Sequence, residues 1–119
     1  MAVQRIRSNP GTLTDLLLLF ADPDTPLSVR IGISAIAETL AGSEILRRAV
    51  PALAPLTLSD APQIRADACY FLGLAGDRTA SASVRRLLED EHPEVREVAA
   101  EALALLGESP AEPGGASGP

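Results

Sequence analysis

One pattern occurs three times along this chain, and it limits the fold more than any other feature. Each copy has a proline two or three residues before an apolar residue and an arginine, then apolar residues at helical spacing, and then a glycine. The three arginines are Arg30, Arg65 and Arg96, which lie 35 and 31 residues apart. A repeat of this period predicts similar structural units stacked side by side.

Each copy carries the signals of one helix. Proline suits the first helical turn, where its missing N–H is not needed, and glycine suits the left-handed residue that ends a helix. The prolines are Pro26, Pro62 and Pro93, and the glycines are Gly42, Gly76 and Gly107. Thr25 is predicted to cap the first of these helices, because its hydroxyl can accept a hydrogen bond from a free N–H of the first turn.

In the third copy the apolar residues form a single helical stripe. They recur at spacings of three and four residues: Val95, Val98, Ala99, Ala102, Leu103 and Leu106. A shorter leucine-rich stretch precedes each copy, and we interpret these stretches, at about residues 13–21, 50–58 and 82–89, as partner helices. The stripe is expected to be buried against Val84, Leu87 and Leu88. Residues 43–49 are an insertion that is expected to lengthen the second partner helix backwards, with kinks at Pro51 and Pro55.

These patterns predict an all-α fold, an α-solenoid of about three stacked antiparallel helix pairs. The repeat domain is expected at residues 12–108, with repeats at about 12–42, 43–77 and 78–108, after an N-terminal lead-in at residues 1–11. Residues 109–119 are mostly proline, glycine, alanine and serine, so we expect a disordered tail there. Aromatic residues make up only 3% of the chain, and a core of leucine and alanine suits packed helices better than sheets.

The third copy also resembles a known repeat family. The residues that carry the resemblance are Leu87-Leu88-Glu89-Asp90, Pro93-Glu94-Val95-Arg96 and Ala99-Ala100-Glu101-Ala102-Leu103. They are similar to the HEAT repeat, and most of all to the compact bacterial form of phycobilin-lyase-like HEAT proteins. The resemblance extends over about residues 12–108. It implies that an aspartate and an arginine of each copy tie its helix pair to the neighbouring pair: Asp22, Arg30, Asp60, Arg65, Asp90 and Arg96.

The net charge of −6 narrows the choice of partner. An acidic surface repels the phosphate backbone of nucleic acids and the anionic face of a membrane, so neither is expected as a partner. No segment has the roughly 20 apolar residues of a membrane span, and we expect a cytoplasmic location. No cofactor is expected, because the sequence holds no pattern typical of metal ligands or of a phosphate-binding loop.

Two residues carry reactive groups, Cys69 and His92. Cys69 occupies the position that Ala100 has in the third copy, which favours a small buried core residue over a thiol nucleophile. His92 is the only histidine, and a metal site needs further ligands at suitable spacing. We therefore interpret His92 as a solvated residue at a helix start, and we expect neither a catalytic site nor a metal site.

The candidate binding surface is apolar with a charged rim. Tyr70, Leu74 and Leu105 are predicted to lie off the buried stripe as an exposed ridge. Apolar and aromatic anchors ringed by charges are typical of protein-binding hot spots, and the expected rim consists of Arg65, Glu97 and Glu101. The alternative is that Tyr70 lies flat over Leu74 and that the tail covers Leu105.

A second apolar surface is expected on the first helix. Its residues Leu16, Leu17, Leu18, Leu19 and Phe20 follow one another directly. Because successive residues point about 100° apart around a helix, one neighbour cannot cover all five. We expect the remaining side to meet residues 2–8, a second copy in a homodimer, or an upstream domain.

The function predicted from the sequence is a non-catalytic module for protein–protein interaction or scaffolding, including the case of an accessory domain in a larger protein. One alternative is a bilin-lyase-like or chaperone-like subunit of an enzyme, in which Cys69 or His92 takes part. Another is a HEAT-like DNA-repair glycosylase, which the net charge and the lack of tryptophan disfavour. The sequence predicts a protein partner without identifying it.

Overall fold

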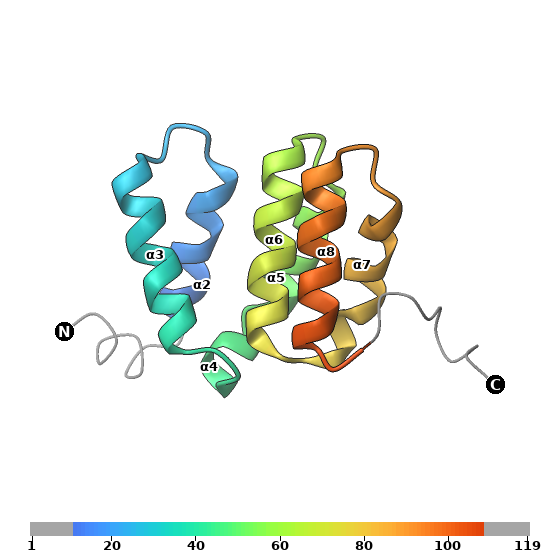
Figure 1. Cartoon of the computed structure of the whole chain (residues 1–119). Helices are drawn as coiled ribbons and strands as arrows, with labels where there is room; N and C mark the ends of the chain where they lie inside the picture. Colours follow the sequence, from blue (N-terminus) through green and yellow to red (C-terminus); the bar gives the residue numbers. More distant parts are fainter. Residues whose placement is uncertain (1–10, 109–119) are drawn as a thin grey trace.

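The computed structural model describes residues 11–108, which form antiparallel helix pairs in two layers (Figure 1). One layer contains α3 (Leu27–Thr39), α6 (Pro62–Ala75) and α8 (Pro93–Leu105). The other contains α2 (Gly11–Leu18), α5 (Val50–Leu53) and α7 (Ser81–Arg86), together with the short 3-10 helices η1 (Leu19–Ala21), η2 (Ala54–Leu58), η3 (Arg78–Ala80) and η4 (Leu87–Glu89). The predicted all-α solenoid is confirmed. The predicted tail and all but Gly11 of the predicted lead-in lie outside the described residues.

The helix ends follow the sequence signals with one exception. Gly42, Gly76 and Gly107 all have left-handed backbones, with φ of 76°, 72° and 79°, as predicted. Thr25, however, does not cap α3, because Pro26 occupies the N-cap position and its carbonyl accepts the Arg30 N–H at 3.1 Å. The Thr25 hydroxyl instead donates to the carbonyl of Leu19 at 2.8 Å, and it thereby holds the loop between η1 and α3.

The insertion at residues 43–49 contains a short helix of its own, α4 (Glu44–Arg47). Ser43 caps it, because the serine oxygen accepts a hydrogen bond from the Leu46 N–H at 3.2 Å. Pro51 and Pro55 then lie in the first turns of α5 and η2. The prediction of one lengthened, kinked helix is therefore wrong, since each proline lies where a helix begins and its missing N–H is not needed.

The core runs between the two layers. The α8 residues Val95, Ala99 and Leu103 are fully buried. Leu106, Val84 and Leu87 are buried with them, and Leu88 is partly buried against the same core. This confirms the stripe predicted for the third copy. The first and second helix pairs share the core through Phe20 and Phe71, whose rings meet edge to face at 4.7 Å.

The first helix has one buried side and one exposed side. Leu17 and Phe20 are buried, Leu16 is partly buried, and Leu18 and Leu19 are exposed. One neighbour therefore leaves part of this leucine-rich stretch uncovered, as the 100° spacing requires. A homodimer or upstream-domain contact at this face stays a prediction. Within residues 11–108 no helix has both the length and the apolar character to span a membrane.

The two interfaces between helix pairs differ in how closely their helices pack. α6 and α8 lie so close at Gly73 that a Cβ added there would be 2.9 Å from the Cα of Ala102. α3 and α6 are joined near their C-terminal ends, where the Gly42 N–H donates to the Leu74 carbonyl at 2.8 Å. Beside this junction a groove of about 550 Å³ remains open between α3 and α6.

Candidate functional site

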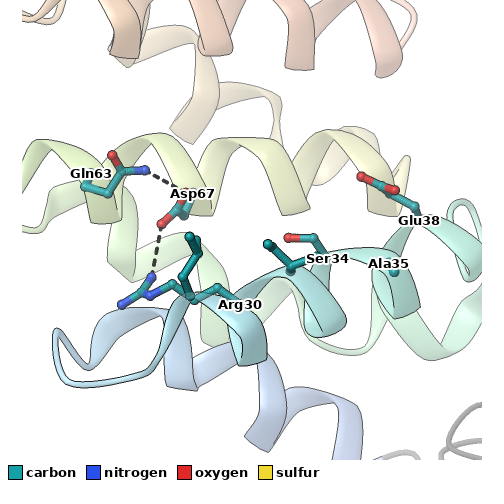
Figure 2. Close-up of a pocket in the computed structure, with 8 residues that line it drawn as sticks. Arg30, Ser34, Ala35, Glu38, Gln63 and Asp67 are labelled. Carbon is teal, nitrogen blue, oxygen red and sulfur yellow. Dashed lines mark hydrogen bonds and ion pairs between the residues drawn. The ribbon is translucent and has the colours of Figure 1, made fainter.

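The groove between α3 and α6 is the candidate site, and Figure 2 shows residues that line it. α3 contributes six lining residues and α6 contributes two: Leu27, Arg30, Ile31, Ser34, Ala35, Glu38, Gln63 and Asp67. The lining combines apolar side chains with two carboxylates and one guanidinium. Such a surface can bind a ligand that is apolar in part and charged in part.

α3 has apolar residues on two faces, and only one of these faces is buried. Ile33 and Ala37 form the buried face, four residues apart. Leu27 and Ile31 are also four residues apart, but they are 70% and 61% exposed. In a regular stack this second face would pack against the next helix, so the exposed Leu27 and Ile31 mark a contact that α6 does not make.

Arg30 is held in place by the loop at one end of the groove. Its Nε donates to the carbonyl of Thr25 at 3.1 Å, and its Nη2 donates to the carbonyl of Asp22 at 2.8 Å. Its Nη1 lies 3.4 Å from the carbonyl of Phe20, and its guanidinium lies over the Phe20 ring at 5.2 Å from the centroid. Arg30 therefore makes most of its hydrogen bonds within its own helix pair. The remaining contact across the groove is an ion pair with Asp67 at 3.7 Å.

Asp67 is the more buried of the two carboxylates in the groove. Its side chain is 19% exposed, and it accepts a hydrogen bond from the Gln63 amide at 3.0 Å. Burial raises the pKa of Asp67 above its ordinary value, and neither Gln63 nor the distant Arg30 reverses that shift. A cation in the groove would improve the surroundings of the ionised carboxylate.

The more closely packed interface between α6 and α8 supplies the comparison, although a smaller groove of about 300 Å³ lies there beside Pro62, Ala66 and His92. There Arg65 binds Asp90 with two hydrogen bonds, Nε to Oδ2 at 2.7 Å and Nη2 to Oδ1 at 3.0 Å. The Asp90 side chain is 7% exposed. The hydrogen bond from Arg65 lowers the pKa of Asp90, and the His92 backbone N–H, which donates to Asp90 at 3.0 Å, adds to this. Asp90 is thus a satisfied carboxylate, in contrast to Asp67.

The aspartates and arginines implied by the repeat pattern have unequal roles. Arg65 and Asp90 tie the second and third helix pairs together, as expected. Arg30 reaches across to Asp67 rather than to Asp60, and Asp60 accepts from Arg65 through its backbone carbonyl. In each pair the arginine also donates to the backbone carbonyl of the aspartate before it: Arg30 to Asp22, Arg65 to Asp60 and Arg96 to Asp90. This recurring bond fixes the loop within the pair.

The opposite end of the groove is bridged by Tyr70 and Glu38. The Tyr70 hydroxyl donates to the Glu38 carboxylate across the space between α6 and α3. Burial raises the pKa of Tyr70 to about 12, and the bond to Glu38 acts in the same direction because it favours the protonated phenol. The groove therefore lies between two polar bridges, Arg30–Asp67 and Tyr70–Glu38.

The predicted ridge of Tyr70, Leu74 and Leu105 is only partly exposed. Leu105 is 57% exposed on α8, as predicted. Tyr70 and Leu74 are partly buried and pack against the core, so their exposure was overestimated. Of the predicted rim, Glu97 and Glu101 are exposed on α8. Arg65 is held by Asp90 and is therefore not a free rim residue. A binding role for this set stays a prediction.

Cys69 and His92 lie where the sequence suggested. Cys69 is fully buried in α6, and burial raises the pKa of its thiol to about 12. His92 is the N-cap residue of α8, where its Nδ1 lies 3.4 Å from Nη2 of Arg65 and 3.7 Å from Oδ1 of Asp90. Within the part of the chain that the structure describes, no three His, Cys, Asp or Glu side chains are grouped as metal ligands.

Leu27, Ile31 and Asp67 were not predicted from the sequence as site residues. A signal was present in the aligned copies. Leu27 occupies the position of Pro62 and Pro93, and Ile31 occupies that of Ala66 and Glu97. Large apolar residues thus stand in the first copy where the others have proline, alanine or glutamate. Asp67 gave no such signal, because its importance depends on its distance from Arg30.

Stacked antiparallel helix pairs define an α-helical repeat protein. A family model for HEAT repeats matches residues 50–113, which is more than half of the chain, and the chain belongs to this family. HEAT repeats are in general modules for protein interaction and scaffolding. The match is to HEAT repeats as such, so the likeness to the phycobilin-lyase-like form stays a resemblance. No curated protein matches the chain.

Proposed function

We propose that this chain is a non-catalytic protein-binding module and that it binds its partner in the groove between α3 and α6. The observation that carries the proposal is the pair of leucine and isoleucine side chains, Leu27 and Ile31, left exposed at 70% and 61% beside an unfilled groove. Contiguous apolar surface with a polar rim is typical of interaction sites. The proposed partner is a protein, and the proposed location is cytoplasmic.

The surroundings of the reactive residues support binding over catalysis. A nucleophilic cysteine needs a thiolate and access to its substrate, whereas Cys69 is fully buried and has a pKa of about 12. The groove instead offers side chains that are suited to contact. Exposed apolar residues supply the area, and the charged residues beside them supply specificity.

The proposal is tested by capturing partners from a lysate of the source cells and mapping cross-links. The double variant Leu27→Ser/Ile31→Ser removes the exposed apolar pair. Its matched control is Leu58→Ser, because Leu58 is 68% exposed on η2 and does not line the groove. We expect cross-links on α3 and α6, at least tenfold less captured partner with the double variant, and unchanged capture with the control.

Two results would contradict the proposal. One is a partner that cross-links elsewhere and is captured equally by the double variant. The other is a partner that is lost with Leu105→Ser alone, which would move the binding surface to α8. Circular dichroism of each variant ensures that a lost partner does not reflect a lost fold. The substituted residues are exposed, so the helical signal should be retained.

A further inference from the structure

The shape of the groove matches a helix lying along α3. The lining residues of α3 run from Leu27 to Glu38, which is three turns or about 16 Å at a rise of about 1.5 Å per residue. Leu27, Ile31 and Ala35 are each four residues apart and so lie on one side of α3. An occupant that presents apolar side chains at the same spacing would contact all three.

The other common ways of binding a peptide do not suit this surface. A partner strand needs the edge of a sheet, and residues 11–108 contain only helices, turns and loops. A polyproline segment needs a groove lined by aromatic rings, and no aromatic side chain is among the lining residues. An amphipathic helix lays its apolar face into a groove, and Leu27, Ile31 and Ala35 offer an apolar row on α3 for that face.

The charges of the groove determine the polar side of the occupant. Two of its three charged residues are carboxylates, Glu38 and Asp67. The guanidinium of Arg30 is engaged by three backbone carbonyls and reaches Asp67 only at 3.7 Å. In the corresponding ion pair between α6 and α8, the Arg65 Nε lies 2.7 Å from the Asp90 Oδ2. Asp67 is therefore a partly buried carboxylate whose one cation in the groove, Arg30, stays 3.7 Å away, and the chain as a whole carries a charge of −6.

From this geometry we infer that the α3–α6 groove takes an amphipathic helix of a partner protein, with apolar side chains against Leu27 and Ile31 and a lysine or arginine beside Asp67. The inference rests on the proposed function and adds the class of partner. In the complex the new cation is the close partner of Asp67, while Arg30 stays held by the backbone carbonyls of its own helix pair. A charge-assisted hydrogen bond in a partly buried site gives both affinity and orientation.

A display library of helical peptides of about 16 residues tests the inference, with the apolar and charged positions randomised. We expect selection on the wild-type protein to enrich leucine or isoleucine at a spacing of four residues, together with one basic position on the same face. Selection on Asp67→Asn should lose the preference for a basic residue. Enrichment of acidic peptides, or the same basic preference with Asp67→Asn, would overturn the inference.

The best selected peptide is then measured in solution by fluorescence anisotropy. Asp67→Asn keeps the size and the acceptor oxygen of the side chain but removes its charge, and we expect Kd to rise about tenfold. Leu27→Ser/Ile31→Ser should raise Kd at least tenfold, whereas Leu58→Ser should leave it unchanged. Equal affinity for all four proteins would show that the peptide binds elsewhere and would overturn the inference.

Together, the peptide and lysate experiments distinguish a failure of the helical-occupant inference from a failure of the proposed function. If no helical peptide is selected, but a partner captured from the lysate is still lost with Leu27→Ser/Ile31→Ser, the groove binds proteins and the helical occupant is wrong. If the captured partner is also unaffected by that double variant, the proposed function fails as well. A captured partner whose cross-linked segment is a basic amphipathic helix supports both.

Discussion

Asp67 in α6 and Asp90, which follows η4, have opposite effects on the stability expected at neutral pH. The pKa of Asp90 is lowered by Arg65, so ionised Asp90 stabilises the fold. This contribution is present above the unfolded value of 3.8 and is lost as the pH falls through the lower folded value. The pKa of Asp67 is raised by burial, so only the protonated form favours the fold. That contribution is present below 3.8 and is lost as the pH rises through the folded pKa.

Replacing each aspartate by asparagine is therefore expected to change the free energy of unfolding differently at the two positions. At pH 7, Asp90→Asn should lower the free energy of unfolding by about 1–3 kcal/mol, because a charge-assisted pair is lost. Asp67→Asn should leave it unchanged or raise it. Urea denaturation at pH 7 and near pH 3 measures both variants, and the deficit of Asp90→Asn should shrink at the lower pH. Equal losses for the two variants at pH 7 would contradict this account of Asp67.

Cys69 is expected to be inert in the folded protein. Its pKa of about 12, compared with 9.0 for an ordinary thiol, reduces the thiolate fraction at pH 8 by about a thousandfold. Labelling with a thiol reagent should be slow in the native state and fast in urea, and Cys69→Ala should leave peptide binding intact. Rapid native labelling, or loss of binding in a folded Cys69→Ala protein, would favour a role for the thiol.

At the scale of helices, Gly73 in α6 has a close neighbour in α8, whereas Gly32 in α3 has open space beside it. A Cβ at Gly73 would meet the Cα of Ala102 at 2.9 Å, whereas a Cβ at Gly32 in α3 would meet nothing within 4 Å. Gly73→Ala should therefore push α6 and α8 apart and lower stability by about 1–3 kcal/mol. Gly32→Ala should raise it by about 0.5–1 kcal/mol, because alanine favours the helix. Urea denaturation of both variants checks this, and a destabilised Gly32→Ala would show that α3 packs more closely than described.

The helix α3 is expected to open more readily than its neighbours. It buries only Ile33 and Ala37 along its length, whereas the buried residues of α6 are Ala66, Ala68, Cys69, Phe71, Leu72, Gly73 and Ala75. Local stability follows buried apolar contact, so the amide hydrogens of α3 should exchange faster than those of α6 and α8. Mass spectrometry of deuterium uptake measures this. A peptide bound in the groove should slow exchange in α3, and exchange as slow as that of α6 without peptide would contradict the prediction.

The helices themselves could be predicted because their signals are local. The apolar stripe from Val95 to Leu106 and the glycines at the helix ends depend only on neighbouring residues. The distance between helix pairs is not local. α6 and α8 are close because Gly73 faces Ala102, which lies 29 positions away in sequence. α3 and α6 are joined by a longer connection that contains α4. The distance between these two helices depends on contacts between residues far apart in sequence, which a short motif cannot predict.

At the scale of the whole molecule, the candidate site was predicted less well than the fold. The sequence placed the ridge at Tyr70, Leu74 and Leu105 by assuming three equivalent pairs. In the structure the Tyr70 hydroxyl instead donates to Glu38, and a groove separates α3 from α6 along part of their length. The assumption failed because the interface between α3 and α6 is more open than that between α6 and α8, and Leu27 and Ile31 are exposed beside it.

The net charge of −6 leads to a prediction about the rate of binding. The field of an acidic molecule attracts a basic helix over a distance set by the ionic strength, about 30 Å at 0.01 M salt and about 8 Å at 0.15 M. The association rate of the selected basic peptide should therefore fall about tenfold or more between these conditions, as measured by stopped-flow fluorescence. Leu27→Ser/Ile31→Ser should mainly raise the dissociation rate, because it removes short-range apolar contacts. An association rate that is independent of salt would show that the acidic charge does not guide the partner to the groove.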